Sequence, residues 1–403
     1  MLRLLLFFPS INFGLLSAEI FPWAMIYSLK QRTLNYRFLV IVLILCFSIF
    51  YFAIVTNFDY LFEHIRALFA YINPLFIFFT IMAVPNREIY RIRKLIFPLL
   101  LFLMFLGLVQ FSGMISFLEP LFEFLIPRSS ASSLASIGRG VTMLSTEPAR
   151  AGYELVFLYA AWRCLTGSNK QWIVIDTLFF VFMVAIIQSA MAVLLTLVYF
   201  AFVYKSRFGI LLLIVPIFIF VVIQFETRAT IIIREIYPII ISPEIFDYFI
   251  NKSGFRFISM LSAFNFGFDN IFGGGVGLWE ITSIEALEGA GFDPSKVSYF
   301  ASQHNSQFVG LRPTSYASNL ALDIGIVGLG MFILLSYKYI RKVMKLPGSD
   351  KSIFYLFVFT FFFTGSVGNP VPWIVVALVL RVKEMSKDMA YDPVPNYASS
   401  FGT

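Results

Sequence analysis

The sequence predicts an all-α polytopic membrane protein in which residues 1–403 form a single integral membrane domain. Composition is the first reason: 59% of the residues are hydrophobic and only 13% are charged, whereas about a quarter of the residues of a soluble domain are charged. The mean hydropathy of +0.84 agrees with this. The second reason is a series of long apolar runs along almost the whole chain. Such runs are typical of helices that cross a bilayer.

The apolar runs give the expected helices in order. They lie near residues 3–29, 38–56, 67–84, 95–118, 151–166, 172–187, 189–204, 208–224, 314–336, 353–365 and 370–380. Several runs are shorter than the ~20 residues that a helix needs to cross a membrane. The pairs 172–187/189–204 and 353–365/370–380 are therefore predicted to form tight hairpins or partly re-entrant helices.

The first run forms either one kinked span or two short ones, which leaves a total of 10–12 transmembrane helices. It is interrupted by Pro9, Gly14, Glu19 and Pro22. It lacks a polar stretch with a small-residue cleavage site, so we expect a retained membrane segment at residues 4–29 rather than a signal peptide.

The basic residues predict which side of the membrane each loop occupies. Every second connection between the predicted spans lies on the same side of the membrane. Six such segments hold nineteen of the 30 Lys and Arg, at residues 30–37, 86–94, 163–170, 205–207, 338–351 and 381–387. The other side has ten Lys and Arg with fourteen Asp and Glu. Because cytoplasmic loops are enriched in Lys and Arg, we expect a cytoplasmic C-terminal tail at 383–403. The opposite side, which in a bacterium is the periplasm or cell exterior, then holds 57–66, a smaller loop at 119–150 and one long loop at 225–312.

The net charge of +7 is explained by this topology and by contact with anionic membrane lipid. No solvated basic domain indicates a nucleic-acid partner. Cys46 and Cys164 lie inside apolar runs, so we expect small buried hydrophobic residues rather than a disulfide or metal ligands.

The smaller external loop allows two interpretations, and the first is purely structural. Thr146 or Glu147 would cap the following helix, and Pro148 would lie in its first turn. Glu147, Arg150 and Glu154 would then form ion pairs along one helical face.

In the second interpretation Arg139, Glu147 and Arg150 face a cavity. Ionisable side chains this close to hydrocarbon are costly unless they are paired or used. The sequence leaves both interpretations open.

The long external loop contains three features of interest. Its beginning is apolar but interrupted by charges such as Arg228, which suggests a helix lying along the membrane interface. A glycine run at residues 273–277 could bind an anion through backbone amides, but it lacks the Lys and Ser/Thr of a phosphate-binding loop, which favours a flexible turn. His304 lies shortly before the next apolar run, where it is either a structural hydrogen-bonding residue or a catalytic base.

These residues follow one another in a distinctive order. The order is Arg139, Glu147 and Pro148 before one span, Arg256 ahead of the glycine run, His304 and Asn305, and a span in which Asp323 precedes Gly-Ile-Val-Gly at 325–328. This order resembles the Wzy-type O-antigen and capsule polysaccharide polymerases and their relative, the O-antigen ligase. The resemblance covers the whole chain in topology and residues 139–154 and 256–328 in motifs. The Glu147 and Pro148 pair is similar to the polymerase branch.

The resemblance implies a GT-C-like glycosyltransferase architecture in the bacterial inner membrane, with the reaction on the periplasmic side. An undecaprenyl-pyrophosphate-linked oligosaccharide would be the donor. A sugar hydroxyl of a second lipid-linked repeat unit would displace the lipid pyrophosphate, with no cofactor and no metal. A chain-length-regulating membrane protein is a candidate partner.

The resemblance also suggests residues for each role. A pyrophosphate leaving group needs cationic side chains that can fork onto phosphate oxygens, and the candidates are, in order, Arg256, Arg150, Arg139 and Arg228. The acceptor hydroxyl needs a base, for which His304 is the first candidate and Glu147 the alternative.

One departure and two alternatives remain. Members of the family often have an Arg at the turn between the two short central spans, whereas this chain has Gln188 and Ser189 there. Either Arg150 or Arg228 takes over that role, or the role is not needed.

An O-antigen ligase that transfers glycan to a lipid A core is the nearer alternative function. A lipid-linked oligosaccharide flippase is the other, although the inverted repeats expected of a transporter are not visible in the sequence.

Overall fold

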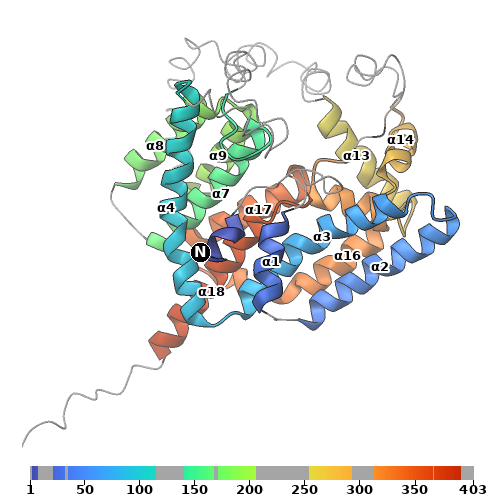
Figure 1. Ribbon diagram of the computed structural model, residues 1–403, viewed down its shortest axis with the longest axis horizontal. Helices are drawn as coiled ribbons and strands as arrows, with labels where there is room; N and C mark the ends of the chain where they lie inside the picture. Colours follow the sequence, from blue (N-terminus) through green and yellow to red (C-terminus); the bar gives the residue numbers. More distant parts are fainter. Residues whose placement is uncertain are drawn as a thin grey trace, which may run out of the picture.

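The structure is a computed structural model that describes residues 2–7, 21–31, 35–114, 140–167, 171–205, 254–292, 310, 312–365 and 367–391. Every regular element within these ranges is a helix (Figure 1), which confirms the predicted all-α class. The predicted run at 208–224 and the predicted interfacial helix after it lie outside the described residues.

Four helices are long and apolar enough to cross a membrane. They are α2 (Tyr36–Val55), α3 (Leu61–Ala83), α4 (Asn86–Phe111) and α16 (Tyr316–Met344). Two shorter apolar helices accompany them, α8 (Trp172–Phe182), which continues as the π-helical turn Met183–Ile187, and α9 (Ala190–Val203). These lengths and compositions support a multi-pass membrane protein, while the total of 10–12 spans stays a prediction.

The remaining helices complete the bundle. They are η1 (Leu2–Phe7), α1 (Pro22–Gln31), α7 (Pro148–Thr166), α13 (Gly254–Asp269), α14 (Trp279–Gly289), α17 (Gly348–Phe363) and α18 (Val371–Tyr391). Helix α8 and its π-helical turn are separated from α9 at Gln188, which has the left-handed φ of 53°. Helices α17 and α18 are likewise separate, so the chain breaks where the two pairs of short helices were predicted. Residues 383–391 of the predicted tail are the end of α18.

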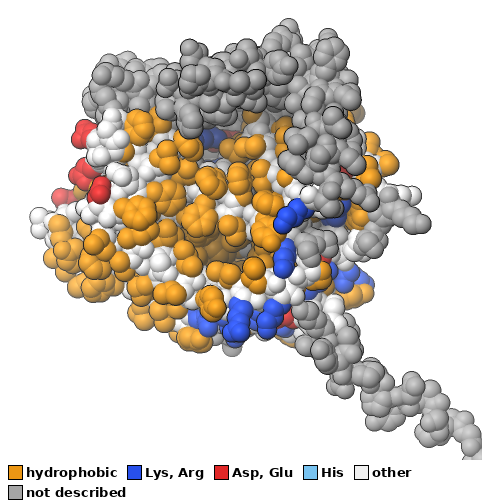
Figure 2. All heavy atoms as spheres, turned by 180° about the vertical axis from the view of Figure 1, so that it is seen from behind, with side chains coloured by type: hydrophobic (Ala, Val, Ile, Leu, Met, Phe, Trp, Pro, Cys, Tyr) orange, Lys and Arg blue, Asp and Glu red, His pale blue; other side chains and the backbone are white. Residues whose placement is uncertain are grey.

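Helix α3 lies at the centre of the bundle and α2 at its outside. In their apolar windows, 67% of the α3 residues are buried but only 22% of the α2 residues. Helix α3 packs against α1, α2 and α18, while Phe47 of α2 is 73% exposed. Figure 2 shows a broad hydrophobic surface with Lys and Arg gathered along its lower edge. A lipid-facing belt with one basic border fits a membrane protein.

Helices α4 and α7 run antiparallel and define two ends of the bundle. At one end Gln110 of α4 donates to the Met143 carbonyl at 3.0 Å and accepts from its N–H at 2.7 Å. At the other end Arg93 of α4 donates to the Leu165 carbonyl at 2.8 Å. Because Met143 precedes α7, the first end also holds the beginning of α7, where Glu147 lies.

The second end is rich in basic residues and ion pairs. Lys342 lies 2.5 Å from Glu384, and Lys383 lies 2.8 Å from Asp350. These contacts join the ends of α16, α17 and α18. The predicted cytoplasmic clusters around residues 86–94 and 338–351 therefore lie at the end opposite Glu147.

Candidate functional site

Glu147 lies at the N-terminus of α7, in the position that the sequence predicted. Its backbone is extended (φ −149°, ψ 150°), Pro148 begins the helix, and the Glu147 carbonyl accepts a hydrogen bond from the Ala151 N–H at 3.0 Å. The carboxylate makes no capping hydrogen bond to its own helix. The backbone of Glu147 thus starts the helix, and its side chain is available for contacts with another part of the chain.

Arg256 of α13 makes that contact. Its Nη2 atom lies 3.6 Å from Oε2 of Glu147. The carbonyl of Arg256 accepts hydrogen bonds from the Ser259 hydroxyl at 3.0 Å and from the Thr314 hydroxyl at 3.4 Å. Thr314 precedes α16, so this end of α13 is held against the beginning of α16. The structure therefore brings together two residues that were predicted to be catalytic and that belong to two different loops.

Stability does not explain this ion pair. At 3.6 Å the contact is longer than the 2.7–3.2 Å of a strong N–H···O hydrogen bond. The Arg256 and Glu147 side chains are 50% and 35% exposed, and exposed pairs contribute only about 0–1 kcal/mol. A guanidinium has five N–H donors, and the contact with Glu147 is made by one nitrogen. Arg256 can therefore bind a phosphate oxygen through its other donors while it stays beside a carboxylate.

A second carboxylate on α7, Glu154, is held by uncharged partners. Glu154 accepts hydrogen bonds from the Ser145 hydroxyl and from the Asn369 amide, both at 2.9 Å. The charge of Arg150, one turn earlier on the helix, also acts on it. The sequence predicted that both carboxylates form ion pairs along one face of α7. Both also have partners outside this helix, Glu147 in Arg256 and Glu154 in Ser145 and Asn369. Asn369 also connects this end of α7 to the start of α18.

A further polar cluster near α16 was not predicted from the sequence as a functional group. The Tyr71 hydroxyl of α3 donates to Asp323 Oδ2 of α16 at 2.7 Å, and both side chains are buried. Arg312 donates from Nε to Asn319 Oδ1 at 2.9 Å and lies over the Tyr71 ring, 5.8 Å from its centroid. The spacing of Asn319 and Asp323 was a usable signal, because polar residues four apart on an apolar helix share a face and must find partners.

The glycine run forms a packed loop and not an open anion site. The N–H groups of Gly274 and Gly275 donate to the carbonyls of Leu322 and Asp323 at 2.8 and 2.9 Å. His64 of α3 contacts the Val276 carbonyl through Nδ1. Two of the loop amides and one carbonyl therefore already bond to α16 and α3. The sequence favoured a flexible turn at these residues. The loop is a turn, but its hydrogen bonds to α16 and α3 hold it against both helices.

Three predicted residues, Arg139, Arg228 and His304, lie outside the described residues, so their roles stay predictions. Gly140, the residue after Arg139, is packed against the break between α8 and α9. A β-carbon at Gly140 would lie 2.0 Å from the Ile187 carbonyl oxygen and 2.9 Å from Cβ of Gln188. Gly140 therefore contacts the turn between α8 and α9, where the resemblance implies an Arg.

Comparisons with known proteins do not identify a family. No protein-family model, no curated protein and no solved structure matches the chain. The resemblance to polysaccharide polymerases rests on the order of the sequence motifs. The ion pair between Glu147 and Arg256 is the structural observation that bears on it.

Proposed function

We propose that this chain is a glycosyltransferase that polymerises undecaprenyl-pyrophosphate-linked oligosaccharide repeat units into O-antigen or capsular polysaccharide. The reaction takes place at the periplasmic face of the bacterial inner membrane. One observation supports the proposal most: Glu147 and Arg256, from separate loops, lie 3.6 Å apart at the end of the bundle opposite the basic clusters. A cation that stabilises the leaving pyrophosphate and a group that accepts the hydroxyl proton are what this transfer needs.

The proposed step is a displacement at the anomeric carbon of the growing glycan. The bond between this carbon and the pyrophosphate oxygen breaks, and a bond to a hydroxyl oxygen of the incoming repeat unit forms. The hydroxyl proton passes to His304 or Glu147, and undecaprenyl pyrophosphate leaves with the electron pair. Arg256 stabilises the leaving group, assisted by Arg150, Arg139 and Arg228. Guanidinium groups placed where negative charge develops can lower the barrier by several kcal/mol.

Arginine also explains why we propose a reaction without a metal ion. A guanidinium is always protonated and can donate two parallel hydrogen bonds to phosphate, which replaces the charge that Mg²⁺ supplies in other transferases. Addition of a chelator to the purified enzyme should leave polymer formation unchanged. Loss of polymer that returns with magnesium or manganese would remove this part of the proposal.

Product length is the decisive measurement. The protein is purified in detergent, reconstituted in lipid vesicles and incubated with synthetic undecaprenyl-pyrophosphate repeat units, and the products are separated by size. A polymerase gives a ladder whose steps equal one repeat unit. Arg256→Ala should abolish the ladder, whereas Arg87→Ala, an exposed residue at the other end of the bundle, should not.

The alternatives give different results in the same assay. A ligase makes no ladder from repeat units alone and gives one product when lipid A core is added. A flippase makes no covalent product and moves the labelled lipid between leaflets. Either result would overturn the proposed polymerase.

A further inference from the structure

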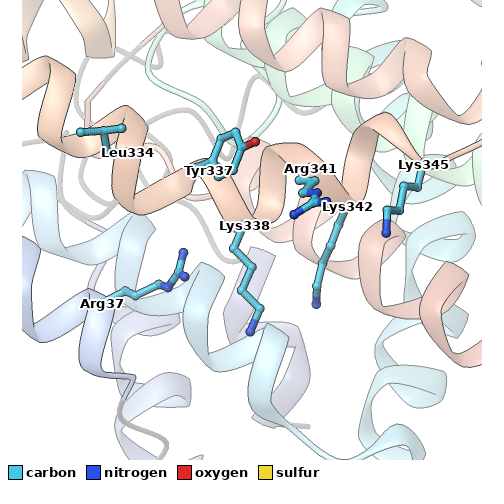
Figure 3. A pocket seen from close by; sticks show the side chains of 7 residues that line it. All are labelled: Arg37, Leu334, Tyr337, Lys338, Arg341, Lys342 and Lys345. Carbon is cyan, nitrogen blue, oxygen red and sulfur yellow. The ribbon is translucent and has the colours of Figure 1, made fainter.

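A groove lies between the end of α16 and the beginning of α2, at the basic end of the bundle. Its volume is about 420 Å³. Five cationic side chains line it, namely Arg37, Lys338, Arg341, Lys342 and Lys345. Figure 3 shows Arg37 reaching toward α16 from α2, while Lys338, Lys342 and Lys345 extend from α16 on the same side. The groove is therefore built by two helices that are far apart in the sequence.

The positive charge of the groove is only partly compensated within the described chain. Lys342 pairs with Glu384 at 2.5 Å, and Arg37 donates from Nη1 to the Leu335 carbonyl at 2.6 Å. No acidic residue of the described ranges forms an ion pair with Lys338, Arg341 or Lys345, which are all exposed. Like charges this close repel one another unless an anion lies among them.

Helix dipoles explain the cations of α16 but not Arg37. Basic residues at the end of α16 are favoured by the negative end of its dipole, and they fit the predicted cytoplasmic side. Arg37 lies in the first turn of α2, where the dipole disfavours a cation. A topological signal requires only charge and does not require residues of two helices to meet in one groove. The arrangement therefore points to a bound anion.

The other groove residues indicate that this anion carries acyl chains. Leu334 and Tyr337 line the same groove and are 73% and 59% exposed. They precede the cations on α16, so the groove runs from the apolar part of the helix to its charged end. A tyrosine at this level is typical of the membrane interface. A free phosphate ion would use the cations alone, whereas a phospholipid would use both parts.

We infer that this groove binds the phosphate headgroup of an anionic phospholipid from the cytoplasmic leaflet. The phosphate lies among Arg37, Lys338, Arg341 and Lys345, and the acyl chains lie along Leu334 and Tyr337. The site is at the opposite end of α16 from Arg256, and it does not depend on the proposed transfer reaction. Its effect is to hold the ends of α2 and α16 together.

Native mass spectrometry of the purified protein tests the site. Phosphatidylglycerol and cardiolipin are titrated in one arm, phosphatidylcholine in a second and inorganic pyrophosphate in a third. The variant replaces three exposed cations of the groove, Lys338→Gln, Arg341→Gln and Lys345→Gln. We expect the variant to bind the anionic lipids at least about tenfold more weakly, because each basic residue near a charged headgroup adds to the attraction.

The matched control removes three basic residues from another cluster at the same end of the bundle, Arg87→Gln, Arg91→Gln and Lys94→Gln. It should retain anionic lipid binding within about twofold, because none of these three residues lines the groove. Equal losses in both variants would mean that net charge, and not the groove, holds the lipid. Equal binding of phosphatidylcholine, or displacement of the lipid by inorganic pyrophosphate, would also overturn the inference.

A conservative variant separates loss of charge from loss of fold. Lys338→Arg with Lys345→Arg keeps all five positive charges and should bind anionic lipid about as well as the unchanged protein. If this variant loses binding as completely as the glutamine variant, the charged groove is not the site.

Discussion

Gly273 and Gly325 meet backbone to backbone, which holds the glycine loop at residues 273–277 against the kink of α16. A β-carbon at Gly273 would lie 2.6 Å from the Gly325 nitrogen, and a β-carbon at Gly325 would lie 2.6 Å from the Gly273 nitrogen. Gly325 interrupts α16 with a φ of 69°, a value that other residues rarely adopt. The kink in α16 and the loop after α13 therefore form one packed unit that also contains Asp323.

The first prediction concerns this contact. Gly325→Ala should lower the free energy of unfolding by roughly 2–4 kcal/mol. Its backbone (φ 69°, ψ −177°) lies in a region essentially restricted to glycine, which costs alanine about 1–3 kcal/mol, and the added methyl group also meets the Ile271 carbonyl at 2.1 Å. Thermal unfolding of the purified protein measures the change. Gly330→Ala is the matched control on the same helix, since its β-carbon would meet nothing within 4 Å. An equally stable Gly325→Ala would contradict the packed loop.

The sequence predicts the local features of this chain better than its long-range contacts. The apolar runs anticipated α2, α3, α4 and α16 because bilayer thickness sets helix length. The Glu147 and Pro148 pair anticipated the start of α7 because proline favours the first helical turn. Neither pattern contains information about which distant segment a side chain meets.

The candidate site shows that limit directly. Glu147 and Arg256 could each be selected from local context, but their 3.6 Å contact depends on how α13 packs against α16. The same holds for Tyr71 and Asp323, which come from helices at opposite ends of the sequence. The glycine run at 273–277 also needed its partner Gly325 before its packing could be understood.

The second prediction concerns the buried carboxylate. Tyr71→Phe removes the hydroxyl that donates to Asp323 Oδ2 at 2.7 Å, and it should destabilise the protein by about 1–3 kcal/mol, the usual cost of an unsatisfied buried polar group. Tyr337→Phe on the exposed side of α16 is the control. Thermal unfolding of the two variants gives the comparison. If Tyr71→Phe unfolds at the same temperature as Tyr337→Phe, the hydrogen bond from Tyr71 to Asp323 does not stabilise the protein.

The third prediction concerns sidedness. Glu288 of α14 and Arg87 of α4 are both exposed, which makes them suitable labelling positions. Cys46 is exposed and not buried as the sequence predicted, so it is first replaced by alanine. An impermeant thiol reagent applied to intact cells should then label Glu288→Cys and not Arg87→Cys. Lysed cells should show labelling of both variants. Labelling of Arg87→Cys alone in intact cells would place the candidate site in the cytoplasm.

The fourth prediction tests the fork geometry of Arg256. Arg256→Lys keeps the positive charge but offers a point charge in place of a planar pair of donors. It should fold normally and lose roughly 10²-fold or more in turnover with the lipid-linked donor, the effect of removing one stabilising donor from a transition state. The same substitution at the exposed Arg87 should leave turnover unchanged. Near-normal rate and polymer length in Arg256→Lys would remove this residue from the proposed catalytic set.

The last prediction decides between the two candidate bases. If His304 accepts the hydroxyl proton, His304→Ala should lower turnover by roughly 10²–10⁴ and leave donor binding almost unchanged, because a general base acts mainly in the transition state. Glu147→Gln should then have the smaller effect. This variant keeps the size of the side chain and removes the charge that lies 3.6 Å from Arg256, so it also reports on the ion pair.

The two roles of Glu147 can be separated by comparing variants. If Glu147 only positions Arg256, Glu147→Gln should weaken donor binding, and Glu147→Asp should restore part of it because the negative charge returns. If Glu147 is the base, turnover should fall by roughly 10²–10⁴ in Glu147→Gln with binding intact, and His304→Ala should be tolerated. Full activity in both Glu147→Gln and His304→Ala would exclude both residues as the base, because a single step cannot lose its proton acceptor without a change in rate.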